Sequence, residues 1–130
     1  REMVRLLDLM PTFLEAAGTP VPENLDASSL VPLLKQSGDW SRDTLYWHYP
    51  HYSNQGGIPA GAIRMGDWKA IRLKVAKDPN APIRMYNLSK DIGETKDIAA
   101  QHPEVIKRIS PLFKSARVES DLFTLYPGKK

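Results

Sequence analysis

Hydrophobic residues near the start of the chain recur at the period of a helix. Asp8 is placed to cap this helix, because its carboxylate can accept hydrogen bonds from the free amides of the first turn. Gly18 and then Pro20 predict where the helix ends. A second, shorter helix is predicted between Ser29, as its cap, and Gly38. The apolar side of the first helix consists of residues at intervals of 4, 3 and 4: Leu6, Met10, Phe13 and Ala17.

The pattern becomes extended from Asp43 onward. β-branched and aromatic residues concentrate in short segments bounded by glycine, proline and polar residues, which is typical of β-strands. Gly66 and Asp67 suit the two-residue turn of a hairpin, so the flanking strands are predicted to pair antiparallel. The predicted strands cover residues 44–49, 61–65, 68–75 and 83–88.

The third predicted strand alternates apolar and basic residues. Ile71, Leu73 and Val75 take every second position, with Arg72 and Lys74 between them. Successive side chains of a strand point to opposite faces of its sheet. We therefore predict that the apolar side is buried and that the basic side faces solvent.

Helical spacing returns at Pro103, which suits the first position of a helix. Val105 and Ile109 begin its apolar stripe, but Pro111 lies inside the same stripe. An interior proline costs a helix about 3 kcal/mol or more, so this helix is predicted to kink or restart near Ser110.

Together these segments predict an α+β fold, with an N-terminal helix pair, an antiparallel sheet of about four strands and a packed C-terminal helix. We expect the 130 residues to form a single unit. Its predicted parts are a helical entry over 1–42, the sheet over 43–88, a short helix and the terminal helix over 89–118, and a tail over 119–130.

Composition narrows the class of protein only slightly. The chain is 42% hydrophobic and 25% charged, as is ordinary for a globular protein. Its net charge of +3 is too small to indicate nucleic acid as a partner, and no apolar run is long enough to predict a membrane span. The absence of cysteine excludes disulfides, thiolate metal sites and cysteine nucleophiles. Because the sequence begins with Arg1 and has no signal-peptide pattern, we expect it to be a fragment of a larger protein.

The sequence contains no familiar catalytic or metal-binding motif, and no catalytic residue is predicted. His48 and His51 are three residues apart, but Pro50 between them disfavours a shared helical face, so zinc is not expected. Near residue 94, three acidic residues lack the ligand order of a calcium loop and fit turn and capping roles instead. They are Asp91, Glu94 and Asp97.

The segment after the first predicted strand is the best candidate for a binding loop. Its glycines and prolines indicate a loop, and exposed loops commonly carry binding groups. Tyr49 and Tyr52 flank its start and could stack on a sugar ring, although sheet packing would also explain aromatic residues here. A basic set on the hairpin could contact an anion or simply be solvated: Arg64, Lys69, Arg72, Lys74, Lys77 and Arg84.

Four segments in order identify a family resemblance: DLMPTFLEAAG, LDASSLVPLL, LYWHYPHYSNQGGIPAGAIRMGDWKAI and MYNLSKDIGETKDIA. Over about residues 3–115 the chain resembles the C-terminal region of formylglycine-dependent sulfatases of the alkaline-phosphatase superfamily. The resemblance implies a subdomain that abuts a larger N-terminal catalytic domain. Calcium and formylglycine are expected in that domain and not in this chain, which contains no C/S-x-P-x-R motif.

The resemblance also implies that the loop after the first strand helps to shape a pocket for a sulfated carbohydrate. Glycines in this loop would let the backbone approach a ligand closely. The implied substrate-binding residues are His48, His51, Tyr52, Asn54 and Gln55.

We therefore expect the C-terminal part of a sulfatase that acts on a carbohydrate, inactive without its catalytic domain. The family resemblance suggests a periplasmic or secreted protein. Two alternatives stay open, namely a stand-alone anion- or carbohydrate-binding module, and the C-terminal part of a related phosphatase or phosphonate hydrolase.

Overall fold

The computed structural model describes residues 2–49 and 57–118. The chain divides into two compact units, Arg1–Asp43 and Thr44–Lys130, and each unit is described by itself. Within the described residues, no helix has the length and apolar character needed to cross a membrane.

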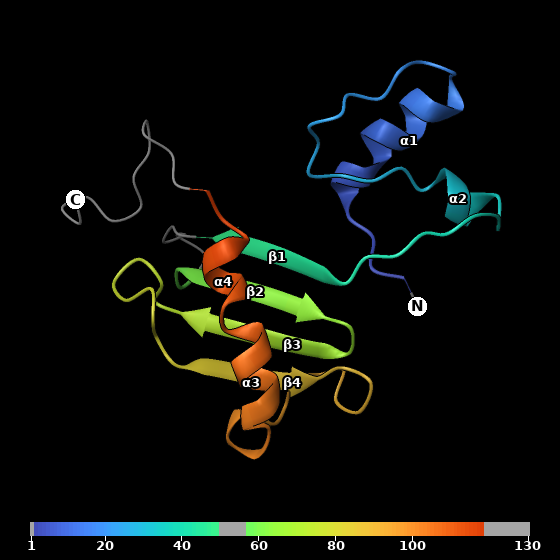
Figure 1. Ribbon diagram of the computed structural model, residues 1–130. Helices are drawn as coiled ribbons and strands as arrows, with labels where there is room; N and C mark the ends of the chain where they lie inside the picture. Colours follow the sequence, from blue (N-terminus) through green and yellow to red (C-terminus); the bar gives the residue numbers. More distant parts are fainter. Residues whose placement is uncertain (1, 50–56, 119–130) are drawn as a thin grey trace. The chain divides into compact units, whose positions relative to one another are not determined.

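The first unit contains the predicted helix pair (Figure 1). A 3-10 turn, Leu6–Asp8, leads into α1 (Leu9–Ala16), and a single turn forms α2 (Val31–Leu34). Gly18 ends α1 as predicted, with a φ of 69° that favours glycine. The amides of Gly18 and Thr19 close the helix end by donating to earlier carbonyl oxygens over 3.0 and 2.9 Å.

Asp8 precedes α1 as predicted, but its carboxylate does not cap the first turn of that helix. It is fully buried and accepts hydrogen bonds from the amides of Arg5 and Ser28 over 2.7 and 3.2 Å. Both terminal nitrogens of Arg42 donate to the same carboxylate over 2.6 and 2.7 Å. The buried Thr12 hydroxyl donates to the Asp8 carbonyl oxygen over 2.6 Å, which adds a second polar link. Asp8 thus fastens distant segments of the first unit together.

The apolar stripe of α1 lies on the outside of the first unit. The side chains of Leu6 and Phe13 are 82% and 64% exposed, and Met10 is also exposed. With neighbouring apolar groups that include Leu25 and Ala27, they line a hollow of about 800 Å³.

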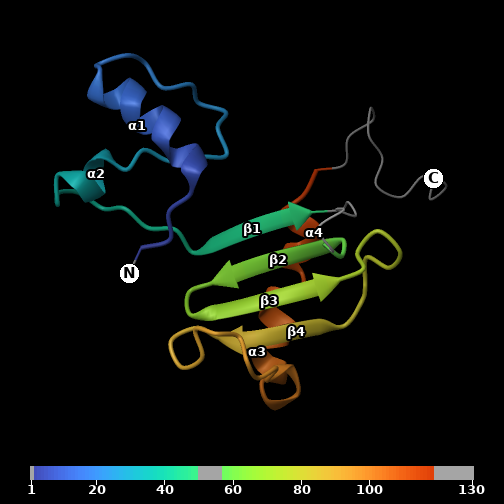
Figure 2. The same ribbon diagram turned by 180° about the vertical axis from the view of Figure 1, so that it is seen from behind.

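The second unit is built on a four-stranded antiparallel sheet with the order β1-β2-β3-β4 (Figures 1 and 2). The strands are β1 (Thr44–Tyr49), β2 (Ala60–Met65), β3 (Trp68–Leu73) and β4 (Ile83–Asn87). Met65 pairs with Trp68 across the predicted two-residue turn, where Gly66 adopts a φ of 58°. The predicted α+β class and sheet are confirmed.

Short helices cover one face of this sheet (Figures 1 and 2). They are a 3-10 turn, Ala99–Gln101, then α3 (Pro103–Ile109) and α4 (Leu112–Ser115). The predicted restart is confirmed, because α3 ends before Ser110 and α4 begins after Pro111. Side chains of Ile63, Ala70 and Ile109 form the centre of the core, each no more than 1% exposed.

The predicted burial of the third strand is wrong for Ile71, Arg72 and Leu73, whereas Val75, beyond the end of β3, is buried as predicted. Ala70, not Ile71, is fully buried under the helices, and the alternation of the strand places Arg72 on the side of Ala70. Ile71 and Leu73 are half-buried on the opposite face. The helix-covered face accepts an arginine because polar atoms at the edge of the core bind its guanidinium. Its two terminal nitrogens donate to the Pro79 carbonyl oxygen and the Ser110 hydroxyl over 2.8 and 2.9 Å.

Candidate functional site

One of the sequence-predicted site residues, His48, lies in the described part of the chain, near the end of β1. The other four fall outside the described residues: His51, Tyr52, Asn54 and Gln55. The structure therefore locates one end of the predicted loop site, and the surroundings of His48 define the candidate site.

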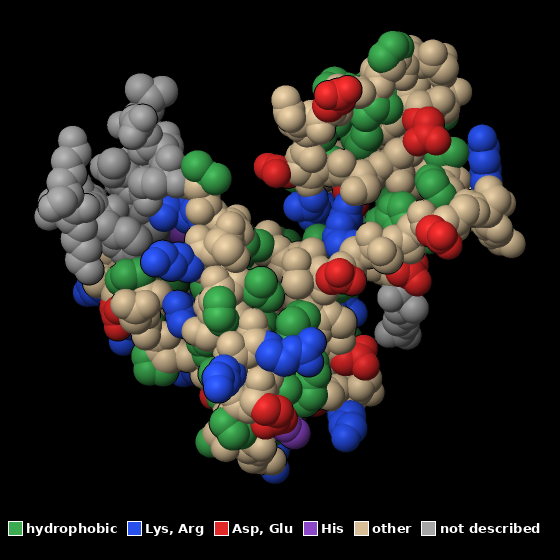
Figure 3. Space-filling model, viewed as in Figure 1, with side chains coloured by type: hydrophobic (Ala, Val, Ile, Leu, Met, Phe, Trp, Pro, Cys, Tyr) green, Lys and Arg blue, Asp and Glu red, His purple; other side chains and the backbone are tan. Residues whose placement is uncertain are grey.

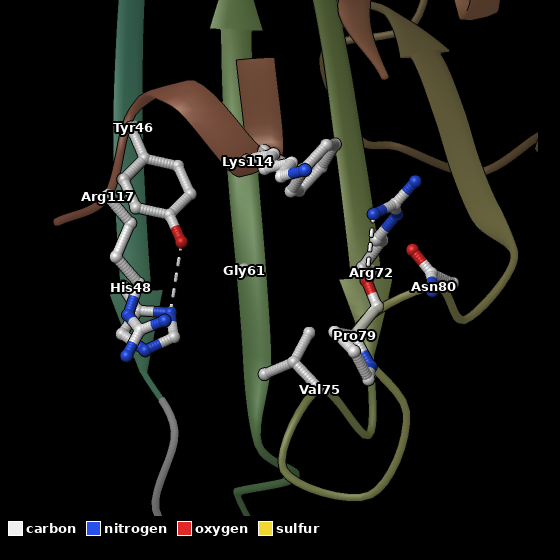
Figure 4. A pocket seen from close by; sticks show the side chains of 10 residues that line it. Tyr46, His48, Gly61, Arg72, Val75, Pro79, Asn80, Lys114 and Arg117 are labelled. Atoms are coloured by element: carbon white, nitrogen blue, oxygen red, sulfur yellow. Dashed lines mark hydrogen bonds between the residues drawn. The ribbon is translucent and has the colours of Figure 1, made fainter. Parts of the chain in front are cut away.

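His48 lines a pocket of about 500 Å³ on the helix-covered side of the sheet (Figure 4). Tyr46 from β1 and Gly61 from β2 lie beside it. The strand β3 contributes Arg72, and the segment after it contributes Val75, Pro79 and Asn80. Phe113 and Lys114 of α4, with Arg117 just beyond, complete the lining. The volume is within the range of small-molecule sites in proteins.

Tyr46 orients the His48 ring. The Tyr46 hydroxyl lies 3.0 Å from His48 Nδ1, and the two rings stack with centroids 5.9 Å apart (Figure 4). We assign the hydroxyl as the donor, since a phenol donates readily to an imidazole lone pair. His48 then carries its proton on Nε2.

Arg72 forms a rigid basic wall of the pocket. Its guanidinium is held by the Pro79 carbonyl and the Ser110 hydroxyl, and it stacks over Phe113 with 4.7 Å from Cζ to the ring centroid. Tyr46 meets the same Phe113 ring edge-on, with centroids 6.5 Å apart. These contacts fix the cation and two aromatic rings relative to one another.

The pocket is positively charged. Arg72, Lys114 and Arg117 line it, and none of the ten described lining residues is acidic. Lysine and arginine side chains also occur among apolar groups on the helix-covered side of the second unit (Figure 3). An anionic ligand with an apolar or ring-shaped body matches this lining.

Sequence reasoning missed most of this pocket. Arg72 belongs to the predicted basic set, but it was placed on the solvent face. Lys114 and Arg117 reach the site only because α4 packs on β2, which lies far earlier in the sequence. Their spacing of three residues is too common to indicate a site by itself.

The acidic turn before α3 takes the structural roles that its sequence predicts. Asp91 accepts hydrogen bonds from the amides of Thr95 and Lys96 over 2.8 and 2.9 Å, which lowers its pKa. Asp97 accepts from two further amides, and Glu94 forms an ion pair with Lys69. Among the described residues, no group of three or more potential ligands is arranged to hold a metal ion.

Known proteins share both the fold and the sequence pattern. BT4656, solved in complex with its substrate D-glucosamine-2-N,6-O-disulfate, aligns with a TM-score of 0.71 and 28% identity over 84% of this chain and 23% of its own. Ps i-CgsB, solved in complex with k-i-k-neocarrahexaose, aligns with a TM-score of 0.68 and 26% identity over 88% of this chain and 24% of its own. Arylsulfatase K of Danio rerio is 34% identical in an alignment of 120 positions, which covers 86% of this chain and 21% of that protein.

This fold, with these relatives, is that of the C-terminal region of sulfatases in the alkaline-phosphatase superfamily. The chain belongs to the family described as N-sulphoglucosamine sulphohydrolase, C-terminal, whose model matches residues 1–118. The predicted resemblance to sulfatases is thus confirmed. The chain spans about a fifth of the curated relative and about a quarter of the two solved chains.

Proposed function

We propose that this chain is the C-terminal part of an enzyme that hydrolyses sulfate esters on a carbohydrate. The observation that carries the proposal is the family match over residues 1–118. BT4656 binds a sulfated glucosamine, which supports a sulfated sugar as the substrate class. The basic pocket beside His48 is chemically suited to such a ligand.

In this proposal the chain forms part of the substrate site and does not carry out the reaction. The expected catalytic domain would supply formylglycine, whose hydrate would be the nucleophile, and calcium, which would neutralise the charge of the sulfate. His48 donates a hydrogen bond at the edge of the substrate. The loop residues His51, Tyr52, Asn54 and Gln55 contact the sugar hydroxyls or the sulfate.

The test uses the full-length protein that contains this chain. We expect it to release sulfate from 4-nitrophenyl sulfate and from D-glucosamine-2-N,6-O-disulfate, with much slower turnover of the matched 4-nitrophenyl phosphate. Preferred turnover of the phosphate ester would assign the protein to the phosphatase alternative. Binding of sulfated sugars without turnover of any ester would favour the binding-module alternative.

Replacing a loop residue tests the role of this chain within the enzyme. We expect His51→Ala to lower kcat/KM for the sulfated sugar by about tenfold, the order of magnitude for loss of one hydrogen bond to a charged group. Thermal denaturation of the variant should match that of the unmodified protein. Unchanged kinetics with a lower melting temperature would instead make His51 a structural residue.

A further inference from the structure

The basic pocket under α4 contains binding groups but lacks the groups that a sulfatase reaction needs. Among its described lining residues there is no acidic metal ligand and no serine, threonine or cysteine nucleophile. The one hydroxyl, on Tyr46, hydrogen-bonds to His48. Within the described lining, a ligand therefore meets groups that can bind it and none that would cleave a sulfate ester.

We propose that this pocket binds a second anionic group of the glycan, a sulfate or carboxylate that is not hydrolysed, and that Lys114 and Arg117 hold it. The inference rests on the proposed function, because it takes the ligand to be the substrate of that enzyme. The pocket would then select sugars with more than one negative charge.

Charge is the first reason for an anion. Arg72, Lys114 and Arg117 line one cavity of about 500 Å³. The Pro79 carbonyl and Ser110 hydroxyl that bind Arg72 are both neutral groups, and they fix the position of its guanidinium. Like charges gathered around one cavity repel each other, and an anion between them relieves that repulsion.

The accessibility of the cations is the second reason. Lys114 is exposed and Arg117 is half-buried, both at the end of the helical layer. Their side chains can therefore reach a ligand that enters from solvent. Arg72 is more constrained, and we assign it as a positioning residue that holds Phe113 and adds positive potential.

The floor and the aromatic wall are the third reason, because they fit a sugar ring and not only a small ion. Gly61 forms part of the lining beside the Phe113 ring. A Cβ there would lie 3.6 Å from that ring, in ordinary contact, so a larger side chain would crowd Phe113 and narrow the cavity. Phe113 and Tyr46 supply ring surfaces of the kind that pack against the C–H groups of a sugar.

The experiment measures binding to the full-length protein by isothermal titration calorimetry. The probes are a heparin tetrasaccharide with sulfates and carboxylates, a carrageenan tetrasaccharide with sulfates alone, and a fully desulfated heparin tetrasaccharide with carboxylates alone. The variants are Lys114→Gln and Arg117→Gln. The matched control is Lys107→Gln, an exposed lysine on α3 that does not line the pocket.

We expect each pocket variant to raise the Kd of the heparin tetrasaccharide by about tenfold, and the control to change it by less than about twofold, the usual scale for a charge-assisted contact. If the pocket variants also raise the Kd of the carrageenan tetrasaccharide, the bound group is a sulfate. If they raise the Kd of the desulfated heparin tetrasaccharide instead, the bound group is a carboxylate. A Kd unchanged in both pocket variants, or raised equally by Lys107→Gln, would overturn the proposal.

These outcomes are separate from those of the proposed function. If the protein hydrolyses sulfate esters but the pocket variants do not change the Kd values, the anion site is contradicted and the proposed sulfatase function is supported. If the pocket variants weaken binding but the protein has no sulfatase activity, the anion site is supported and the proposed enzymatic function is contradicted. A steric variant gives an independent check, since Gly61→Leu fills the pocket and should weaken binding of the same probes, whereas Gly61→Ala should not.

Discussion

Asp8 shows how a single buried carboxylate can organise a segment of more than thirty residues. Its charge is balanced by Arg42, and its remaining acceptor capacity is used by the amides of Arg5 and Ser28. The hydrogen bonds from Arg42 are the largest cause of a pKa lowered to about 2, and they outweigh the opposing effect of burial. This arrangement gives a physical reason for the aspartate and threonine of the D-x-x-P-T sequence at residues 8–12. The Thr12 hydroxyl links the Asp8 carbonyl to the amide of Leu30.

Stability should therefore depend on the protonation of Asp8. The folded-state pKa of about 2 is below the ordinary value of 3.8, so the contribution is complete well above pH 3.8 and is lost as the pH falls towards 2. Its size is about 2 kcal/mol. We expect Asp8→Asn to destabilise the chain at pH 6, with a difference from the unmodified chain that shrinks by this amount near pH 2.

Urea denaturation at the two pH values measures this effect. The control is Asp67→Asn, because Asp67 is exposed in the β2–β3 turn. A stability difference for Asp8→Asn that stays constant from pH 6 to pH 2 would show that the charge of Asp8 is not what stabilises the fold.

At the scale of secondary structure, Pro111 determines how the helical layer ends. Ser110 and Pro111 both have helical φ and ψ angles, so the chain continues in the same sense from α3 to α4. Proline has no amide hydrogen and cannot make the hydrogen bond that a continuous helix would have here. The break precedes Phe113 and Lys114, and so it affects the element that lines the pocket.

Replacing this proline should join the two helices. We expect Pro111→Ala to increase the helical signal in circular dichroism and to stabilise the chain by up to about 1 kcal/mol, since one backbone hydrogen bond is gained. The control is Pro103→Ala at the start of α3, where the missing amide costs nothing and no such gain is expected. Equal effects of both substitutions would show that the break does not depend on Pro111.

The sequence predicted the strands to within a few residues, because the alternation and the turn at Gly66 are local signals. It failed on which face of β3 is buried, since alternation cannot tell which side a distant helix covers. Ala70 has a small side chain, so the helix can approach the sheet closely at this position. The alternating pattern points instead to the larger, more hydrophobic Ile71 as the buried residue. The sequence put forward His48 and Arg72 as candidate binding groups, but it could not place Lys114 and Arg117 beside them, because α4 reaches β2 only through tertiary packing.

At the scale of the whole molecule, the proposed partner of this chain is a catalytic domain of the sulfatase family. It matches its family over residues 1–118 and about a fifth of a curated sulfatase relative. The described residues contribute a sheet, a helical layer and a basic pocket, whereas the proposed reaction chemistry lies outside this chain.

The 130-residue chain by itself is thus expected to be inactive. We expect no turnover of 4-nitrophenyl sulfate above the buffer rate, with or without added calcium, because the chain has no C/S-x-P-x-R motif from which to form the nucleophile. Spectrophotometric detection of nitrophenol checks this, with the full-length protein as the positive control. Calcium-dependent turnover by the purified chain would place a complete active site within these residues.

The outward-facing stripe of α1 has a practical consequence for work with this chain. The exposed side chains of Leu6, Met10 and Phe13 form a hydrophobic surface, and such surfaces promote aggregation in water. A preparation of the chain should fluoresce strongly with the dye anilinonaphthalene sulfonate and grow in particle size as it is concentrated. Replacing these three side chains by glutamine should reduce both the dye fluorescence and the aggregation, without changing any residue of the sheet.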